Sequence, residues 1–247
     1  MATIYLYGFH TVEAYLQKFP KNINVLWVLK DRHDQRVQSL VHTAEQVPIT
    51  IRTASREQLD ELSADGLHQG VVIECKELLS YSEKDLPTLL EGLAEPAFLL
   101  ILDGVQDPHN LGACLRSANA AGVHAVIAPK DRAASITPTV RKVACGAAEM
   151  TPFIQVTNLA RTLRFLQEQG IWLYGMAAEA EKTVFETKIN GAVGLVLGSE
   201  GYGLRQLTQK HCDDLFKIPM YGTVSSLNVS VATAVGLFEV VRQRLST

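Results

Sequence analysis

Two uninterrupted apolar runs constrain the fold of this 247-residue chain more than any other feature. The first, Phe98-Leu-Leu-Ile-Leu, ends at Asp103-Gly104, and the second, Val193-Gly-Leu-Val-Leu, ends at Gly198. A strand with one solvated face alternates apolar and polar residues, whereas a run without alternation is typical of a strand buried on both faces. The first run therefore predicts a buried strand of a parallel sheet, and the second predicts a further strand, in a sheet that helices cover on both faces.

The segments around these runs alternate between helical and strand-like patterns. We expect helices at 111–121, 138–147, 158–169, 203–210 and 226–244, and further strands at 125–128, 153–156, 171–175 and 215–218. This alternation predicts an α/β domain over residues 97–247 with a mostly parallel sheet.

Residues 1–76 have the pattern of a second, smaller α/β unit. We expect helices at 12–19, 35–46 and 56–63, and strands at 24–29, 49–51 and 71–75. The polar segment 77–96 contains one possible short helix and is closed by Pro96, so we interpret it as a linker.

Composition excludes several classes of protein. Hydrophobic residues make up 47% and charged residues 20%, so the chain can bury a core and is not disordered. The net charge of −3 indicates no generally basic surface, although a local basic groove for nucleic acid remains compatible with it. The four cysteines share no CxxC spacing and the histidines do not cluster, which favours reduced thiols and no metal site.

We expect a cytoplasmic protein that does not span a membrane. The N-terminus lacks a basic segment followed by an apolar core, so no secretory signal is predicted. No residue between Lys217 and Glu239 carries a formal charge, but this stretch contains Pro219, Gly222 and several Ser and Asn residues. Those polar groups favour a loop that leads into a buried helix over a membrane span.

Ligands of such a sheet bind beyond the carboxyl ends of its strands, and three loops there carry suitable side chains. The first follows the run at 98–102, where Asp107 or Asn110 can cap the next helix. Arg116 follows among small residues of that helix. An isolated Arg is more often a surface residue, but the Asn-Leu-Gly turn before it favours a positioned one.

The second loop, Leu197-Gly-Ser-Glu-Gly-Tyr-Gly, contains three glycines that would let a ligand approach the backbone. A tight turn is the simpler explanation, although Glu200 is unusual inside one. The loop does not match GxGxxG, so a dinucleotide site is poorly supported.

The third loop runs from Ile218 to Ser230, and either Ser225 or Ser226 is expected to cap the final helix, with Asn228 in its first turn. That helix is apolar on nearly all sides. We therefore expect both of its faces to be buried, with part of that surface against a second subunit. One apolar stripe consists of Leu227, Val231, Val235, Phe238 and Val241. From the residues alone, the activity stays open, including a nucleotide-dependent enzyme of another class.

The three loops resemble, in order and spacing, the signature motifs of the SpoU class of RNA 2′-O-methyltransferases, the TrmH family. The matching segments are Asn110-Leu-Gly-Ala-Cys-Leu-Arg116, Leu197-Gly-Ser-Glu200-Gly-Tyr-Gly203 and Ile218-Pro-Met-Tyr-Gly-Thr-Val-Ser-Ser226-Leu-Asn228-Val-Ser-Val-Ala. In the first unit, Tyr7-Gly-Phe-His-Thr-Val and His68-Gln-Gly-Val resemble the start and end of the family's substrate-binding extension.

The resemblance implies an α/β fold whose C-terminal segment forms a trefoil knot, as in SPOUT-like proteins, an exception to unknotted topology. It implies an N-terminal RNA-binding domain similar to a ribosomal protein, and a homodimer through the catalytic domain. The implied activity is methyl transfer from S-adenosylmethionine to the ribose 2′-hydroxyl of a guanosine in large-subunit (23S) ribosomal RNA. A transfer-RNA ribose methyltransferase of the same class and a non-catalytic RNA-binding protein stay open as alternatives.

The resemblance also implies roles for particular residues, and it implies no metal. Arg116 would be the catalytic residue, as base or by orienting the RNA, and Asn110 would hold the arginine or the ribose. Glu200 would orient Arg116 or Asn228, and Ser226 would line the site with Asn228. The cofactor would be held by Gly198, Ile218, Met220 and Leu227.

Overall fold

The computed structural model describes residues 3–32, 34–76 and 81–246. These residues divide into two compact units. The first contains the chain up to residue 76 together with residues 145–150, and the second contains residues 81–144 and 151–246.

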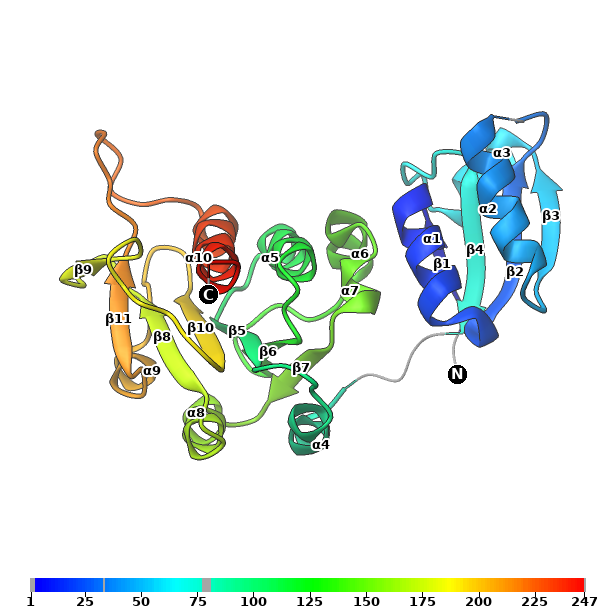
Figure 1. Ribbon diagram of the computed structural model, residues 1–247. Coiled ribbons are helices and arrows are strands. Elements are labelled where there is room, and N and C mark those ends of the chain that lie inside the picture. Colours follow the sequence, from blue (N-terminus) through cyan, green and yellow to red (C-terminus); the bar gives the residue numbers. More distant parts are fainter. Residues whose placement is uncertain (1–2, 33, 77–80, 247) are drawn as a thin grey trace. The chain divides into compact units, whose positions relative to one another are not determined.

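The first unit is built on a four-stranded mixed sheet of order β1-β4-β2-β3 (Figure 1). The strands are β1 (Thr3–Tyr7), β2 (Ile23–Leu29), β3 (Thr50–Ala54) and β4 (Val71–Lys76), of which only β2 and β3 pair in parallel. The helices α1 (Phe9–Lys18) and α2 (Gln35–Glu45) pack on one face, and α3 (Arg56–Leu62) packs on the other. A 3-10 turn, η1, spans Pro20–Asn22.

The second unit contains a seven-stranded sheet of order β7-β6-β5-β10-β8-β11-β9, in which every pairing is parallel. Its strands are β5 (Phe98–Asp103), β6 (Ala125–Pro129), β7 (Phe153–Val156), β8 (Trp172–Met176), β9 (Lys182–Thr183), β10 (Val193–Gly198) and β11 (Asp214–Lys217). All residues of β5 and β10 are buried, and Leu195 of β10 lies between Leu100 and Tyr174. The predictions of a mostly parallel sheet and of a buried strand at the first apolar run are confirmed, and the structure places β5 and β10 next to each other within the sheet.

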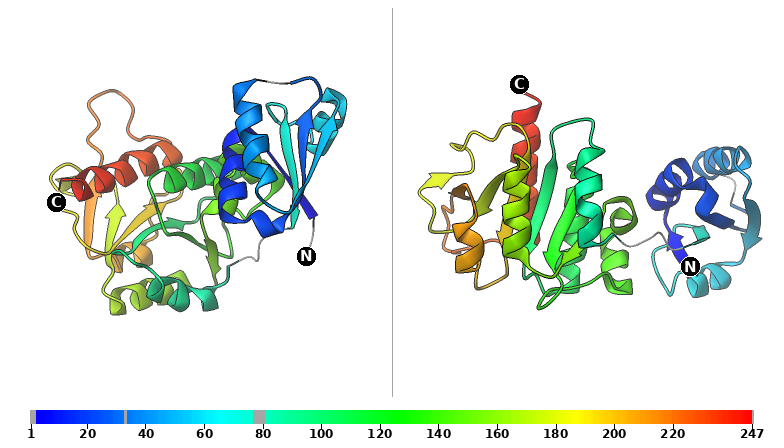
Figure 2. Two further views of the ribbon diagram at one scale, coloured as in Figure 1. Left: turned by 45° about the vertical axis from the view of Figure 1, so that its right-hand side comes forward. Right: turned by 90° about the horizontal axis from the view of Figure 1, so that it is seen from below.

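Helices cover both faces of this sheet. One face carries α5 (Pro108–Ala120), α6 (Pro138–Ala144) and α10 (Val229–Arg244), with α10 beside α5 (Figures 1 and 2). The other face carries α4 (Leu86–Glu91), α8 (Leu159–Glu168) and α9 (Gln206–Lys210). The arrangement confirms the predicted covering of both faces.

Several predicted helix boundaries are wrong. The helices α1, α5 and α9 begin at Phe9, Pro108 and Gln206 instead of residues 12, 111 and 203, and two further boundaries differ as follows. The helix expected at 138–147 ends at Ala144, because Cys145 and Gly146 have φ angles of 51° and 90°, and a separate short helix, α7 (Ala147–Met150), follows. The last helix begins at Val229 instead of residue 226. Its N-cap is Asn228, whose side-chain oxygen accepts a hydrogen bond from the Ser230 amide at 2.9 Å, so neither Ser225 nor Ser226 caps it.

The interpretation of residues 77–96 as a linker needs correction. Residues 77–80 lie outside the described residues, but 81–96 fold as part of the second unit, with a 3-10 turn, η2 (Glu83–Asp85), followed by α4. Leu86 is buried there. The Glu83 carboxylate accepts hydrogen bonds from Thr157 and Arg161, which lower its pKa. The polar residues that suggested a linker therefore anchor this segment to the second unit.

None of the helices in the described ranges is long and apolar enough to cross a membrane. The charge-free stretch after Lys217 instead divides into an exposed loop at 221–228, which projects from the sheet (Figure 2), and the first part of α10.

Candidate active site

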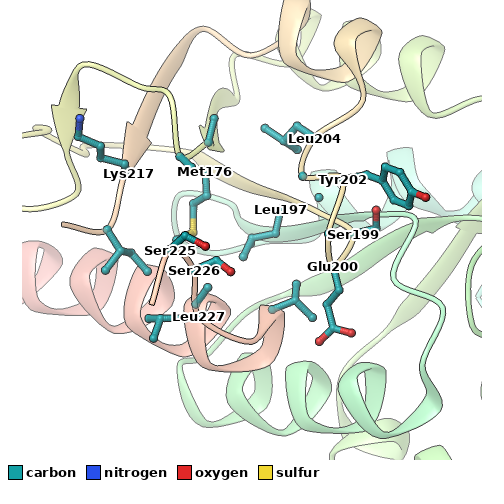
Figure 3. Close-up of a pocket in the computed structure, with 18 of the residues that line it drawn as sticks. Met176, Leu197, Ser199, Glu200, Tyr202, Leu204, Lys217, Ser225, Ser226 and Leu227 are labelled. Atoms are coloured by element: carbon teal, nitrogen blue, oxygen red, sulfur yellow. The ribbon is translucent and has the colours of Figure 1, made fainter. Parts of the chain in front are cut away.

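A cavity of about 1010 Å³ lies at the carboxyl ends of β8, β10 and β11 (Figure 3). These strands are neighbours in the order β10-β8-β11, so the segments that follow them meet at one edge of the sheet. The lining comes from residues 176–179, 197–204, 217–220, 225–229 and 232. The structure thus brings the second and third predicted loops together around one cavity.

The glycine loop after β10 is a tight hairpin. Ser199 and Gly203 exchange two backbone hydrogen bonds of 3.0 and 3.1 Å. A Cβ atom on Gly198 would lie 1.9 Å from the carbonyl carbon of Gly203, so no larger residue fits at position 198. The hairpin directs Glu200 toward α5 and α10 (Figure 3) and leaves Tyr202 fully exposed.

Three polar side chains from the three loops form one hydrogen-bonded cluster. The amide nitrogens of Asn110 and Asn228 each donate to Oε1 of Glu200 at 2.7 Å. Asn228 also donates to the side-chain oxygen of Asn110 at 3.0 Å. Two amides thus fix one charged oxygen of Glu200 in a single orientation.

Beneath this cluster, Cys114 of α5 and Thr233 of α10 lie with sulfur and hydroxyl oxygen 3.4 Å apart. Burial, with a smaller contribution from Glu200, raises the pKa of Cys114 to about 11. Its thiol is therefore neutral near neutral pH and is not a nucleophile there.

Asp103 is a functional candidate that the sequence reasoning missed. It ends β5 and is almost fully buried. One carboxylate oxygen accepts a hydrogen bond of 3.1 Å from the Arg205 amide, and the other lies 3.5 Å from the Arg205 guanidinium. The contact between Asp103 and Arg205 therefore links the end of β5 to the segment just after the glycine hairpin. The sequence feature that could have indicated Asp103 is a carboxylate at the end of an apolar run.

The predicted site residues fall into three groups. Those lining the cavity are Gly198, Glu200, Ile218, Met220, Ser226, Leu227 and Asn228. Asn110 is buried behind the lining and reaches it through Glu200 and Asn228. Arg116 lies on the exposed side of α5 and does not line this cavity.

The chemistry of the lining fits a nucleoside-type ligand that carries a positive charge. Met176, Leu197 and Leu227 provide apolar surface, and the glycine hairpin provides backbone donors and acceptors. The charged lining residues are Glu179, Glu200 and Lys217, so acidic groups outnumber basic ones. This balance suits a sulfonium cofactor better than a polyphosphate.

The fold and this site define a class of protein: the chain belongs to the SpoU rRNA methylase family, whose model matches residues 97–238. A second model, described as RNA 2′-O ribose methyltransferase substrate binding, matches residues 5–80. Among its relatives is the 23S rRNA (guanosine-2′-O-)-methyltransferase RlmB of Escherichia coli strain K12. The two chains are 55% identical over 239 residues, 97% of this chain and 98% of that protein. The family resemblance carried by the three motifs is confirmed.

Solved structures show the same fold. The SpoU methyltransferase AviRb from Streptomyces viridochromogenes, in complex with the cofactor AdoMet, has a TM-score of 0.75 at 22% identity. That match covers 99% of this chain and 92% of AviRb. The TrmH/SpoU tRNA modifying enzyme of A. aeolicus is 29% identical, with a TM-score of 0.56. That match covers 66% of this chain and 84% of the enzyme's chain.

Proposed function

We propose that this chain transfers the methyl group of S-adenosylmethionine to the ribose 2′-hydroxyl of a guanosine in 23S ribosomal RNA. The observation that carries the proposal is the 55% identity to the E. coli 23S rRNA (guanosine-2′-O-)-methyltransferase over 97% of the chain. Such a substrate would place the protein in the bacterial cytoplasm.

The large cavity is the proposed cofactor site. Backbone groups of Gly198, Ile218 and Leu227 would hold the nucleoside part, with Met220 against it. When bound, S-adenosylmethionine supplies an electrophilic methyl group. The acidic lining and the close-packed backbone at Gly198 support this assignment.

The reaction requires removal of a proton from a weakly acidic ribose hydroxyl. We assign this step to Arg116, which would act on the hydroxyl or on the adjacent RNA phosphate. Because a guanidinium normally stays protonated at neutral pH, phosphate-assisted deprotonation or a strong local perturbation is needed. Asn110 and Asn228 would keep the Glu200 carboxylate fixed beside the reacting groups, and Ser226 would line the site.

We also propose a homodimer through the catalytic unit. Within one chain, α10 is buried on one side, and the expected second subunit would have to cover the other. Its other side exposes Val231 and Phe238 by 49% and 48%, and Leu245, the C-cap residue, by 84%. These residues follow one another at intervals of seven positions, which places them on one side of the helix. A second copy of the chain packed on this face would cover the apolar stripe.

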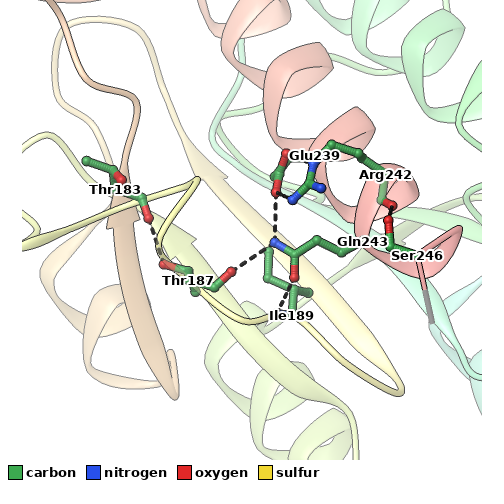
Figure 4. Close-up of polar contacts among 7 residues, drawn as sticks. All are labelled: Thr183, Thr187, Ile189, Glu239, Arg242, Gln243 and Ser246. Atoms are coloured by element: carbon green, nitrogen blue, oxygen red, sulfur yellow. Dashed lines mark hydrogen bonds and ion pairs between the residues drawn. The ribbon is translucent and has the colours of Figure 1, made fainter.

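A trefoil knot is the proposed path of the C-terminal segment. The chain runs through β11 on the far side of β8 and returns as α10 to pack on α5 and β10. Gln243 of α10 then bonds the backbone of the segment between β8 and β10: its amide donates to Thr187 O at 2.9 Å, and its oxygen accepts from Ile189 N at 2.8 Å (Figure 4). These contacts support a path in which the terminal helix passes the segment at residues 177–192, as the proposed knot requires.

Ribosomal RNA is favoured over transfer RNA because the A. aeolicus tRNA modifying enzyme covers only 66% of this chain. The substrate-binding match at residues 5–80 instead indicates an additional RNA-contacting unit. The test is transfer of a labelled methyl group to 23S ribosomal RNA and to transfer RNA, both prepared without modifications. We expect label in the ribosomal RNA. Label in transfer RNA alone would favour the alternative substrate, and cofactor and RNA binding without any transfer would favour a non-catalytic protein.

A further inference from the structure

A second cavity, of about 430 Å³, lies at the carboxyl ends of β6 and β7, on the same sheet edge as the large cavity. Its lining includes Arg132, Arg205 and the start of α8 at residues 157–160. We propose that this second cavity binds a phosphodiester group of the RNA strand that flanks the target nucleotide. The inference rests on the proposed function, because it takes the substrate to be RNA.

Contacts with a buried carboxylate fix the position of Arg205. Its amide and its guanidinium both contact Asp103, which is 1% exposed, at 3.1 and 3.5 Å. The Arg205 side chain itself is half exposed. A guanidinium has five N–H donors in a planar fork, so the buried carboxylate can fix one side while the other faces a ligand oxygen.

Arg132 supplies a second cation. It is exposed, and among the described residues it makes no ion pair within 4.0 Å of a carboxylate. A Cβ atom on Gly104 would lie 3.0 Å from Nη2 of Arg205 and 3.7 Å from the carbonyl oxygen of Arg132. The Arg205 guanidinium and the backbone of Arg132 therefore lie on either side of Gly104, whose φ of 86° suits glycine, and both arginines line the cavity.

The start of α8 adds partial positive charge to the same wall. Asn158 caps this ten-residue helix by accepting from the Arg161 amide at 3.0 Å. Leu159 and Ala160, in its first turn, line the cavity. Asp131 is the acidic residue of the lining, and it is exposed. The nearby Glu83 is already paired with Arg161 at 2.6 Å.

The position of the cavity favours an RNA phosphodiester over a free phosphate ion. Arg205 follows Gly203 by two residues, so the same loop carries Glu200 at the large cavity and Arg205 at the second one. An RNA strand that presents a ribose at the first cavity also carries a phosphate at every neighbouring nucleotide. Phosphate contacts fix the register of a nucleic acid without reading its sequence.

The test compares RNA binding by the full-length wild type, Arg132→Gln and the matched control Arg164→Gln across a series of salt concentrations. Arg164 is an exposed residue of α8 that lines neither cavity. We expect Arg132→Gln to weaken RNA binding on the order of 3- to 10-fold and to lower the slope of log affinity against log salt by about 0.7–0.9. S-adenosylmethionine binding should be unchanged in both variants.

Arg205→Lys is the second test variant, since it keeps the charge opposite Asp103 but loses the fork. We expect it to weaken RNA binding while the unfolding temperature stays close to that of the wild type.

Equal RNA affinity and equal salt slope for Arg132→Gln and Arg164→Gln would overturn the proposal. Inorganic phosphate that binds the wild type but not Arg132→Gln, with RNA affinity unaffected, would also overturn it and assign the cavity to free phosphate. A wild type that binds RNA but transfers no methyl group would instead refute the proposed function, and the binding comparison would still stand.

Discussion

Glu200 shows at the scale of single residues how distant parts of the sequence build one site. Its partners Asn110 and Asn228 lie 90 positions before it and 28 after it, yet both donate to the same oxygen. The motifs indicated these three residues, but no local pattern showed that they share hydrogen bonds. The Asp103–Arg205 contact was missed for the same reason, because its partners are 102 positions apart and belong to different loops.

Glu200→Gln tests the cluster with little change in volume. The new side chain has no negative charge in either orientation of its amide. If the amide nitrogen faces the two donating asparagines, it also cannot accept their hydrogen bonds. We expect methyl transfer to fall on the order of 100-fold, in the range found for loss of one catalytic electrostatic contact. Single-turnover transfer to RNA measures this. Unchanged transfer in a folded variant would reduce Glu200 to a structural role.

Arg116 should act in the chemical step. Arg116→Ala and Arg116→Lys are both expected to lose on the order of 100-fold or more in single-turnover methyl transfer, because lysine lacks the planar fork. S-adenosylmethionine binding should hardly change, since Arg116 does not line the cavity proposed for the cofactor. A plain surface arginine would change stability by at most about 0.5 kcal/mol and activity little. A transfer rate within a few-fold of the wild type would remove Arg116 from the mechanism.

At the scale of elements, the sequence predicted best where burial determines the pattern. β5 and β10 have no polar alternation because helices cover both of their faces, so β5 was predictable as a buried strand and β10 as a strand. β1 was missed because only Leu6 among its five residues is buried, and β9 because it has two residues. The start of α10 depended on which of three nearby polar residues caps it, a choice that the contacts of Asn228 determine.

The C-terminal end of α10 provides a pH-dependent test of stability. Hydrogen bonds from Arg242, at 2.7 and 2.9 Å, and from Gln243 lower the pKa of Glu239 (Figure 4). A lowered folded-state pKa stabilises the protein above the unfolded value, about 4.5, and this contribution is lost as the pH falls through the folded-state pKa.

We therefore expect Glu239→Gln to lower the free energy of unfolding by about 1–3 kcal/mol near neutral pH. The difference from the wild type should shrink as the pH falls below 4.5. Urea unfolding at several pH values measures it. A difference that is constant with pH would contradict the assigned role of the Glu239 carboxylate.

At the scale of the whole molecule, chemistry and RNA selection are assigned to different units. Residues 1–79 carry eight Lys and Arg against ten Asp and Glu, so RNA binding by this unit must depend on local groups. Arg32 and Arg36 stack on Phe9, and Arg52 stacks on Trp27, which places arginine and aromatic side chains together there.

Removal of residues 1–80, which include most of the first unit, should separate the two roles. The truncated chain should begin at residue 81, because α4 and the buried Leu86 belong to the second unit. We expect residues 81–247 to bind S-adenosylmethionine with affinity similar to that of the full chain and to lose site-selective RNA methylation. Calorimetry and a methyl-transfer assay measure the two properties. Retained selectivity would contradict the division of roles.

The chemical position of the transferred methyl group tests the proposed activity of the protein. The full chain would be incubated with labelled S-adenosylmethionine and unmodified 23S ribosomal RNA, and the RNA would be digested to nucleosides and analysed by mass spectrometry. We expect label in 2′-O-methylguanosine from a single site. Label on a nucleobase, or on the ribose of another nucleoside, would contradict it.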